Sequence, residues 1–382
     1  MHVLFLTPWY PNKWDVMDGI FVRKHAEAVS RMEKVTVVYA HSDATQKDFA
    51  VNVKEDGNLT EILIYYPGPS TGVMSALVKA VNFMRAIAYG VGLAESRVGK
   101  IDVCQVSVMT RCAVMAWWLK HKKGVKYYIL EHWSRYYPEN NSYRGFVRRL
   151  LTRCAVRESE GLMTVSHALA EAMKECGIKS SRWLRVNNVV DDFFYTDRDQ
   201  RQAGGRTRLL CVTTFSEQSK NVSGIIRAIA KVRARRSDFV LDLIGNGPDI
   251  GKIRQMVDSY DLADSVTFVG EVMPPMVSKI MHRSDAVVMF SNFETFGVVL
   301  SESLAVGLPV ITTNVGIAPE VVDSEIGIVV PVRDEEALVE AIDKMLDTYS
   351  LYDREYIRQR GRQFSFDTVG RQLVGLYKQA IS

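Results

Sequence analysis

The chain has 382 residues and a formal net charge of +4, and 47% of its residues are hydrophobic. At about 150 residues per domain this length predicts two domains, and the apolar share is ample for two cores. The five cysteines are scattered and include no pair at zinc-ligand spacing. The composition therefore excludes a disulfide-stabilised scaffold and indicates no metal site.

The first residues predict a strand. The apolar run VLFLT begins almost at once and ends at Pro8, without the basic start and small-residue cleavage site of a secretory signal, so we expect a cytoplasmic chain. The long apolar segment at 73–95 is interrupted by Lys79 and Arg85, and its apolar residues, from Met74 to Ala88, recur at helical spacing. This pattern predicts an amphipathic helix and not a membrane span.

Short apolar runs alternate with helix-period segments along almost the whole chain. This alternation is typical of parallel sheets covered by helices on both faces, so it predicts an α/β fold. The first series of predicted strands comprises 3–6, 35–39, 101–106, 125–130 and 162–165. The second series comprises 209–212, 240–244, 266–269, 286–290, 309–311 and 326–329.

A polar, glycine-containing segment separates the two series and is typical of a linker. We expect an N-terminal Rossmann-like domain over residues 1–190, a linker over 191–206 and a C-terminal Rossmann-like domain over 207–362. The last segment, 363–382, has apolar residues at helical spacing and is expected to be a helix that packs back on the N-terminal domain. Two doubly wound domains of this kind are expected to face each other across a cleft, with ligands at the carboxyl ends of the strands.

Positive charge is concentrated between Lys120 and Arg157, where ten lysines and arginines are accompanied by only Glu131 and Glu139. Aromatic residues are interleaved with them at Trp133, Tyr136, Tyr137, Tyr143 and Phe146. Such a block favours contact with an anionic membrane or a phosphorylated acceptor, and nucleic acid is the less favoured partner. A solvated helix face is the simpler explanation.

Two residues of the first half stand where ligands are expected. Gly19 precedes a predicted helix after the first strand, and a helix start without a side chain lets an anion approach free amide groups. An ordinary helix start explains the same pattern. His132 follows the strand at 125–130. A structural histidine is the simpler explanation there, but the place at the strand's carboxyl end favours a function.

The second half carries a cation in a similar place. Lys220 and Asn221 follow the strand at 209–212 and are predicted at a helix start, where a lysine and amide groups together bind phosphate oxygens. The next strand ends at Gly245 in the segment IGNGP. Its glycines lack the dinucleotide-binding spacing and support only a tight turn beside a ligand.

The segment NFETFGVVLSE, residues 292–302, places two glutamates around a glycine. If a helix begins near Gly297, with a rise of about 1.5 Å per residue, Glu302 lies roughly 7 Å inside it and Glu294 stands on the preceding loop. The helix start between them suits an anion, and each carboxylate suits hydroxyl groups beside that anion. Two glutamates that face water explain the spacing equally well.

This segment resembles the signature of the family 4 retaining glycosyltransferases of the GT-B fold. Similar segments are FVGEV, SDAVVMFSNFETFG, AVGLPVITTNVGIAPEVV and IGIVVPVRD in the second half, and WYPN, DGIFV and EHWS in the first. The resemblance covers nearly the whole chain and is most specific from Asp285 to Val322. It implies a retaining glycosyltransferase of the bacterial surface-glycan type.

The resemblance also implies roles for single residues. Glu302 would bind the ribose and Glu294 the donor sugar, while Lys220 with Gly19 would hold the diphosphate. His132 would contact the sugar near the reacting centre, so His132 and Glu294 are the candidate catalytic residues, for positioning and charge stabilisation. The other candidate donor contacts are Asn221, Gly245, Val272 by the base, and the backbone amides of Phe296, Gly297, Val298 and Val299.

The chain departs from the family at Thr214, where an arginine usually stands six residues before the lysine. No Asp-x-Asp motif is present, since the nearest acidic pair is Asp191 and Asp192 beside the expected linker. The resemblance therefore implies transfer from a nucleoside diphosphate sugar, UDP favoured over GDP, without a metal or other cofactor. The acceptor would be a saccharide or lipid-linked glycan, reached at the inner face of the plasma membrane with peripheral contact through residues 120–157.

Two alternatives stay open from the sequence. A nucleotide-sugar epimerase shares the two-domain architecture but lacks the paired-glutamate signature. A non-catalytic nucleotide-binding scaffold is compatible with the loss of the arginine at Thr214.

Overall fold

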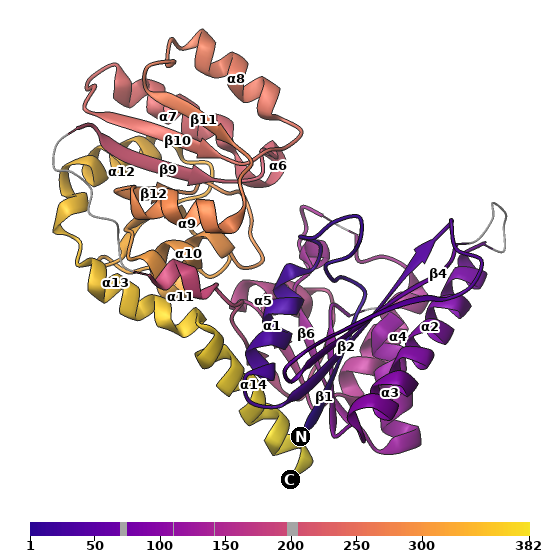
Figure 1. Cartoon of the computed structure of the whole chain (residues 1–382). Helices are drawn as coiled ribbons and strands as arrows, with labels where there is room; N and C mark the ends of the chain where they lie inside the picture. Colours follow the sequence, from indigo (N-terminus) through magenta and orange to yellow (C-terminus); the bar gives the residue numbers. More distant parts are fainter. Residues whose placement is uncertain (69–74, 110, 141, 197–204) are drawn as a thin grey trace. The chain divides into compact units, whose positions relative to one another are not determined.

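The computed structural model describes residues 1–68, 75–109, 111–140, 142–196 and 205–382. The chain divides into two compact units (Figure 1). The N-terminal unit comprises Met1–Val189 and Phe366–Ser382, and the C-terminal unit comprises Val190–Ser365. Met74 of the predicted amphipathic helix and residues 197–204 of the expected linker lie outside the described residues.

The N-terminal unit contains an eight-stranded sheet in the order β3-β4-β2-β1-β5-β6-β7-β8. All neighbouring strands are parallel except β3 and β4, which pair antiparallel. The strands are β1 His2–Thr7, β2 Lys34–Asp43, β3 Ala50–Asp56, β4 Leu59–Pro67, β5 Val103–Ser107, β6 Lys126–Glu131, β7 Gly161–Thr164 and β8 Trp183–Arg185. All five predicted strands are present, but β3, β4 and β8 were not predicted.

Helices cover both faces of this sheet. They are α1 Ile20–Ser30, α2 Ser75–Val98, α3 Arg111–Lys123, α4 Phe146–Glu158, α5 His167–Glu175 and α14 Phe366–Ile381, with the short 3-10 helix η1 Ser134–Tyr136. The helices α2, α3 and α4 lie on one face, and α1 and α14 on the other (Figure 1). Within the described part of the chain, no helix has the length and apolar character that crossing a membrane requires.

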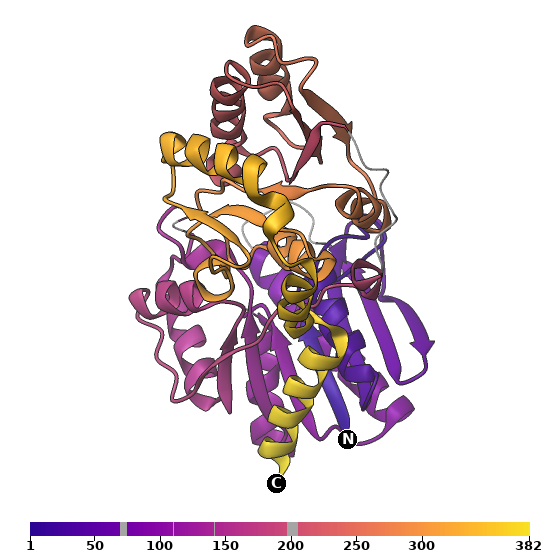
Figure 2. The ribbon, with the colours of Figure 1, turned by 90° about the vertical axis from the view of Figure 1, so that its left-hand side faces the viewer.

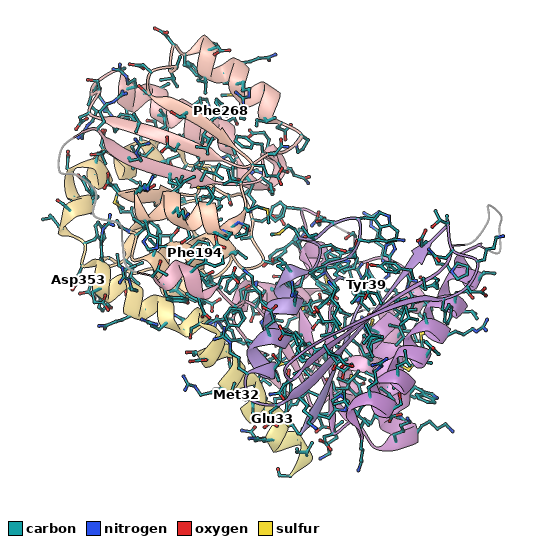
Figure 3. All side chains as sticks on the ribbon, viewed as in Figure 1. Met32, Glu33, Tyr39, Phe194, Phe268 and Asp353 are labelled. Carbon is teal, nitrogen blue, oxygen red and sulfur yellow. The ribbon has the colours of Figure 1, made fainter. Side chains whose placement is uncertain are left out.

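The last helix, α14, belongs to the N-terminal unit. Lys378 forms an ion pair with Glu33 at 3.1 Å, and the Tyr128 hydroxyl donates a hydrogen bond to the Leu376 carbonyl at 3.0 Å. Met32 and Glu33 lie beside α14 (Figure 3). A Cβ atom at Gly370 would lie 2.4 Å from the Ala28 carbonyl oxygen, so a glycine is required for α1 and α14 to approach this closely.

The C-terminal unit contains a six-stranded parallel sheet in the order β11-β10-β9-β12-β13-β14. The strands are β9 Thr207–Val212, β10 Phe239–Ile244, β11 Val266–Gly270, β12 Ala286–Val288, β13 Val310–Thr313 and β14 Gly327–Val330. All six were predicted. The order of the strands reverses between β9 and β12, and such a reversal is where open parallel sheets bind ligands.

The helices of this unit complete a Rossmann-like fold. They are α6 Glu217–Lys220, α7 Val222–Arg233, α8 Ile250–Ser259, α9 Pro274–His282, α10 Val298–Val306, α11 Ala318–Val321, α12 Glu335–Thr348 and α13 Arg354–Gly361, with the 3-10 helices η2 Asp192–Tyr195, η3 Tyr349–Leu351 and η4 Arg362–Phe364. The core contains apolar residues of α7, α12, β9 and β10, and α12 lies against α7, β13 and β14. Figure 2 shows the ribbon turned by 90° from the view of Figure 1. The prediction of an α/β fold with two Rossmann-like domains is confirmed.

The segment expected to be a linker begins with ordered structure. Residues Asp192–Tyr195 form η2, which lies against α9 and α10 of the C-terminal unit. Phe194 is fully buried there, and the Ser278 hydroxyl donates to the Phe193 carbonyl at 2.9 Å. This aromatic cluster was not recognised from the sequence, because the polar residues that follow it are typical of a linker.

Candidate functional site

The loops that follow β9 and β12 meet at the strand-order reversal of the C-terminal sheet. Lys220, at the end of α6, forms an ion pair through Nζ with Oε1 of Glu294. The Ser291 hydroxyl donates to the same carboxylate oxygen at 2.9 Å. The side chains of Lys220 and Glu294 are 24% and 13% exposed, so both are largely shielded from water yet open to a ligand.

Asn292 fixes these two loops together. Its backbone N–H donates to the Ser219 carbonyl at 2.7 Å, and its side-chain amide donates to the Gln218 carbonyl at 3.0 Å. The Arg333 side chain donates to the Asn292 Oδ1 at 3.1 Å. Because hydrogen bonds tie both loops to one residue, Lys220 and Glu294 are held in place before any ligand binds.

The local helix structure differs from the prediction at Lys220. This residue ends the one-turn helix α6 instead of opening a helix, and Asn221 caps α7 with a left-handed backbone at φ 48°. Asparagine tolerates this conformation better than most residues, since its short side chain bonds locally. The prediction of a helix start at Lys220 was therefore wrong by two residues, and α7 begins at Val222.

The start of α10 lies directly after Glu294. Gly297 caps this helix with φ 100°, and no side chain caps its free amide groups. Phe296 is buried and packs edge-on against the Phe364 ring at 5.9 Å between centroids. Val298 and Val299 occupy the first turn, and Glu302 lies in the second turn with 9% exposure. The structure thus places a carboxylate on each side of an uncapped helix start, as the spacing predicts.

A second glycine, absent from the predicted site, supports this arrangement. Gly316 has φ 58°, and a Cβ atom there would lie 2.3 Å from the Phe296 carbonyl oxygen and 2.9 Å from the Glu294 Cβ. The Ile317 N–H donates to the same Phe296 carbonyl at 2.9 Å. The segment after β13 therefore buttresses the Glu294 loop, and only a glycine fits. In the sequence, the glycine of NVGIAPE was the only signal of this role. That it lies against Phe296 and Glu294 could not be predicted from the sequence.

The remaining donor-site candidates lie on neighbouring loops of the same sheet edge. Gly245 has φ 128°, and a Cβ atom there would lie 1.8 Å from the Thr213 carbonyl oxygen, so the predicted tight turn is present. Val272 is half-buried between β11 and α9. Thr214 is exposed on the loop after β9. Among the described residues, no group of three or more His, Cys, Asp and Glu side chains is arranged to hold a metal ion.

Gly19 and His132 belong to the N-terminal unit and lie on adjacent loops there. Gly19 caps α1 with φ 58°, and a Cβ atom would lie 2.3 Å from the Trp9 carbonyl carbon. The Phe21 ring in the first turn of α1 lies 4.3 Å from the His132 ring, and the Trp9 and Trp133 rings are 4.7 Å apart. The loop after β1 thus packs on the loop after β6.

A buried carboxylate organises the loop that carries His132. Glu131 is fully buried at the end of β6. One oxygen accepts from the N–H groups of His132 and Trp133 at 2.9 and 3.0 Å. The other accepts from the Met109 N–H at 3.0 Å and the Tyr136 hydroxyl at 3.2 Å. Burial raises the pKa of Glu131, and the backbone hydrogen bonds oppose that rise. No pattern in the sequence indicated this role for Glu131.

His132 itself is buried and lacks hydrogen-bond partners within the described part of the chain. Its side chain is 7% exposed, and neither ring nitrogen is bonded. Burial lowers the pKa of His132 well below its ordinary value, and nearby His25 lowers it further. A neutral imidazole with unused nitrogens is suited to a hydroxyl group of a ligand, since it can donate and accept.

The pKa of His132 predicts a pH dependence of stability. The unfolded chain binds a proton at this residue near pH 6.5, whereas the folded chain does so only at lower pH. The free energy of unfolding of the N-terminal unit should therefore fall as the pH drops below about 6.5. Unfolding in urea at pH values from about 7 to about 5 should show a weaker pH dependence for His132→Asn than for the wild type. An unchanged slope would contradict the neutral assignment.

Three lysines of the basic block are anchored to the fold. Lys120 bonds to the Glu158 carbonyl, Lys123 to Glu95 and Lys126 to the Ala380 carbonyl, each at 2.5 Å. Tyr136 and Tyr143 are buried, so these two aromatic residues of the block belong to the core and not to an interface. Phe146, at the start of α4, is 81% exposed.

The sequence of the C-terminal unit matches a known family model. Residues 194–364, nearly all of that unit, match the family model described as glycosyl transferases group 1. The N-acetyl-alpha-D-glucosaminyl L-malate synthase of Bacillus anthracis is 29% identical over 210 residues, which cover 53% of this chain and 54% of that protein. The alpha-D-kanosaminyltransferase of Streptomyces kanamyceticus is 24% identical over 275 residues, which cover 67% and 71%. The chain spans about half the length of several such relatives.

Solved structures share the whole architecture. The sucrose-phosphate synthase of Thermosynechococcus elongatus has a TM-score of 0.75 at 18% identity, over 100% of this chain and 99% of that one. Anabaena HepE in complex with UDP has a TM-score of 0.73 at 15% identity, over 99% and 100%. The chain therefore has the GT-B fold, and its C-terminal unit matches the group 1 glycosyltransferases.

Proposed function

We propose that the protein is a retaining, metal-independent glycosyltransferase. It transfers a sugar from a nucleoside diphosphate, UDP being favoured over GDP, to a hydroxyl group of a saccharide or lipid-linked glycan in surface polysaccharide synthesis. The observation that carries the proposal is the Lys220–Glu294 pair beside the uncapped start of α10, at the strand-order reversal. The family match over residues 194–364 and the UDP-bound HepE neighbour support it.

The proposed chemistry uses the groups at this site. The bond between the anomeric carbon and the phosphate oxygen breaks, a new bond forms to the acceptor oxygen, and the acceptor proton passes to the departing phosphate. Negative charge develops on the leaving diphosphate, and Lys220 with the free N–H groups of α10 stabilises it. Glu294 accepts hydrogen bonds from hydroxyl groups of the donor sugar, and Glu302 accepts hydrogen bonds from hydroxyl groups of the ribose.

Lys220 has two partners in this scheme. Without a donor it is paired with Glu294, and with a donor it binds the diphosphate. Glu294 is then released and accepts hydrogen bonds from hydroxyl groups of the sugar. In the unliganded site, the ion pair keeps both side chains ordered. His132 is proposed to contact the sugar from the N-terminal unit, and Gly19 the diphosphate.

One assay tests the proposed activity. The protein is incubated with UDP-, GDP- and ADP-sugars, with and without a crude lipid acceptor, and nucleotide release and product are measured. We expect the release of nucleoside diphosphate to increase with acceptor and the product to retain the anomeric configuration. The activity should not fall when a metal chelator is added. An isomerised sugar nucleotide would identify an epimerase, and no reaction with any donor would favour a nucleotide-binding scaffold.

We also propose that α4 contacts an anionic membrane from the cytoplasmic side. Its exposed residues outside the cavity described below combine apolar and basic side chains: Phe146 and Leu150 are 81% and 50% exposed, and Arg144 and Arg149 are exposed beside them. Apolar side chains flanked by arginines are typical of helices that lie in the interface of anionic lipids.

Vesicle binding tests this contact. Phe146→Ser with Leu150→Ser should reduce co-sedimentation with phosphatidylglycerol vesicles, because both apolar anchors are lost. Val81→Ser on α2, whose side chain is 48% exposed, is the matched control and should bind as the wild type does. Equal binding of the wild type to phosphatidylcholine and phosphatidylglycerol vesicles, or full binding by the double variant, would refute the contact.

A further inference from the structure

The N-terminal unit holds a cavity of about 550 Å³ at its own strand-order reversal, between β1 and β5. Trp9 reaches it from the loop after β1, and Arg111 from the start of α3, the helix after β5. Trp133 and Arg135 line it from the loop after β6, beside His132. The cavity therefore occupies the place where a parallel sheet of this kind binds ligands.

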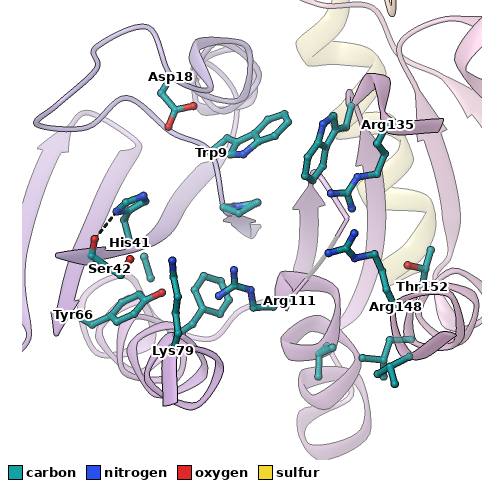
Figure 4. Close-up of a pocket in the computed structure, with 17 residues that line it drawn as sticks. Trp9, Asp18, His41, Ser42, Tyr66, Lys79, Arg111, Arg135, Arg148 and Thr152 are labelled. Carbon is teal, nitrogen blue, oxygen red and sulfur yellow. Dashed lines mark hydrogen bonds between the residues drawn. The ribbon is translucent and has the colours of Figure 1, made fainter. Parts of the chain in front are cut away.

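Four cations from four different elements point into this cavity. Figure 4 shows Lys79 of α2, Arg111 of α3, Arg135 of η1 and Arg148 of α4 with their charged ends turned toward the same space. Asp18 is the one carboxylate among the residues that line the cavity. Asp18 accepts a hydrogen bond from Asn12 at 3.1 Å, and burial raises its pKa, so one carboxylate stands against four cations.

The fold itself does not neutralise these cations. Among the described residues, none of the four forms an ion pair. Arg111 lies 4.9 Å from the Phe83 ring centroid, and Arg148 donates to the Ser142 carbonyl at 3.4 Å. Four unpaired positive charges around one space repel one another, and an anion in that space would relieve the repulsion.

Arg135 is the strongest indication of a ligand. Its side chain is 4% exposed and stacks on the Trp133 ring at 3.1 Å, yet its Nε has no hydrogen-bond partner. Glu131 lies nearby, but both of its oxygens already accept hydrogen bonds from the backbone or Tyr136. A buried guanidinium without a carboxylate partner is costly unless a ligand supplies the missing charge.

We propose that this cavity binds the acceptor through an anionic group, a carboxylate or a phosphate, and that the enzyme selects acceptors carrying one. The inference rests on the proposed glycosyltransferase function. The planar guanidinium group can bind two oxygens of a carboxylate or phosphate through paired hydrogen bonds. The half-buried rings of Trp9 and Trp133 at the cavity wall provide apolar faces for the sugar that carries the charge.

Three soluble probes test the charge requirement. Methyl glucuronide, glucose 6-phosphate and methyl glucoside share the sugar ring and differ in a carboxylate, a phosphate and no charge. Their binding to the full-length protein is measured by ligand-detected NMR, which does not depend on turnover. We expect at least one anion to bind and methyl glucoside to bind far more weakly. The stronger of the two anions identifies the group as a carboxylate or a phosphate.

Variants of two of the four cations test the location. Arg148→Gln and Lys79→Gln should each weaken binding of the preferred anion roughly ten- to a hundredfold, as expected for one charge-assisted contact. Arg97→Gln is the matched control, because Arg97 lies in the last turn of α2, outside the cavity, with a 46% exposed side chain paired with Glu55. It should leave the affinity unchanged.

Different outcomes test the anionic cavity and the proposed glycosyltransferase activity. Equal binding of the neutral and anionic sugars, no binding of either anion, or unchanged affinity in both Arg148→Gln and Lys79→Gln would overturn the anionic cavity. Failure of every nucleotide sugar to react would instead overturn the glycosyltransferase proposal, and the NMR result would still report on the cavity.

Discussion

The Glu302→Ala variant is expected to bind UDP roughly ten- to a hundredfold more weakly than the wild type, because a buried carboxylate that accepts ribose hydroxyl groups contributes about 1.5–3 kcal/mol. The Glu294→Ala variant should bind UDP nearly as well as the wild type. Its turnover should fall roughly a hundred- to a thousandfold, since the donor sugar is no longer positioned. Calorimetric titration with UDP and steady-state kinetics measure the two effects separately.

Glu336→Ala provides the matched control for both glutamates. The Glu336 side chain is 74% exposed on α12, where it pairs with Lys231. Its loss should change neither UDP affinity nor turnover. Equal UDP affinity in Glu302→Ala and the wild type would contradict the ribose assignment, and full turnover in Glu294→Ala would contradict the sugar assignment.

The Glu131→Gln variant is expected to lower the free energy of unfolding of the N-terminal unit by about 3 kcal/mol. The carboxylate accepts four hydrogen bonds, three from the loop that carries His132 and one from the Met109 N–H after β5. A glutamine amide has one acceptor oxygen, so its NH2 group would face donors that then lack a partner. All six tryptophans lie in the N-terminal unit, so urea unfolding followed by tryptophan fluorescence reports on this unit alone.

Glu139→Gln is the control for this substitution. Glu139 is exposed a few residues further along the same loop, and its change should stay within about 0.5 kcal/mol of the wild type. If Glu131→Gln proved as stable as Glu139→Gln, the buried carboxylate would not be what holds the His132 loop.

The alternation of strands and helices predicted all six strands of the C-terminal sheet, but it failed for β3, β4 and β8 of the N-terminal sheet. The strands β2, β3 and β4 follow one another without a helix between them, so β3 and β4 do not fit an alternating pattern. β3 is also largely exposed and polar, with the sequence AVNVKED, and therefore carries little apolar signal. β8 has three residues, too few for a periodic pattern.

The candidate site was predictable where a single segment holds it. Glu294, Gly297 and Glu302 lie within eleven residues, so their relation follows from helix geometry. The Lys220–Glu294 pair joins residues 74 positions apart, and no local pattern specifies it. The same holds for the cationic cavity, whose members Lys79 and Arg148 come from different helices. The basic block was visible in the sequence, but which of its arginines share a space depends on the tertiary fold.

The return of α14 to the N-terminal unit reverses the order in which the two units can be completed during synthesis. The chain leaves that unit after Val189 and re-enters it at Phe366. The buried Gln105 side chain accepts a hydrogen bond from the hydroxyl of Tyr377, and Tyr377 is translated long after Gln105. The C-terminal unit is continuous in sequence, so all of its strands are synthesised before the last helix that covers the first strands to emerge.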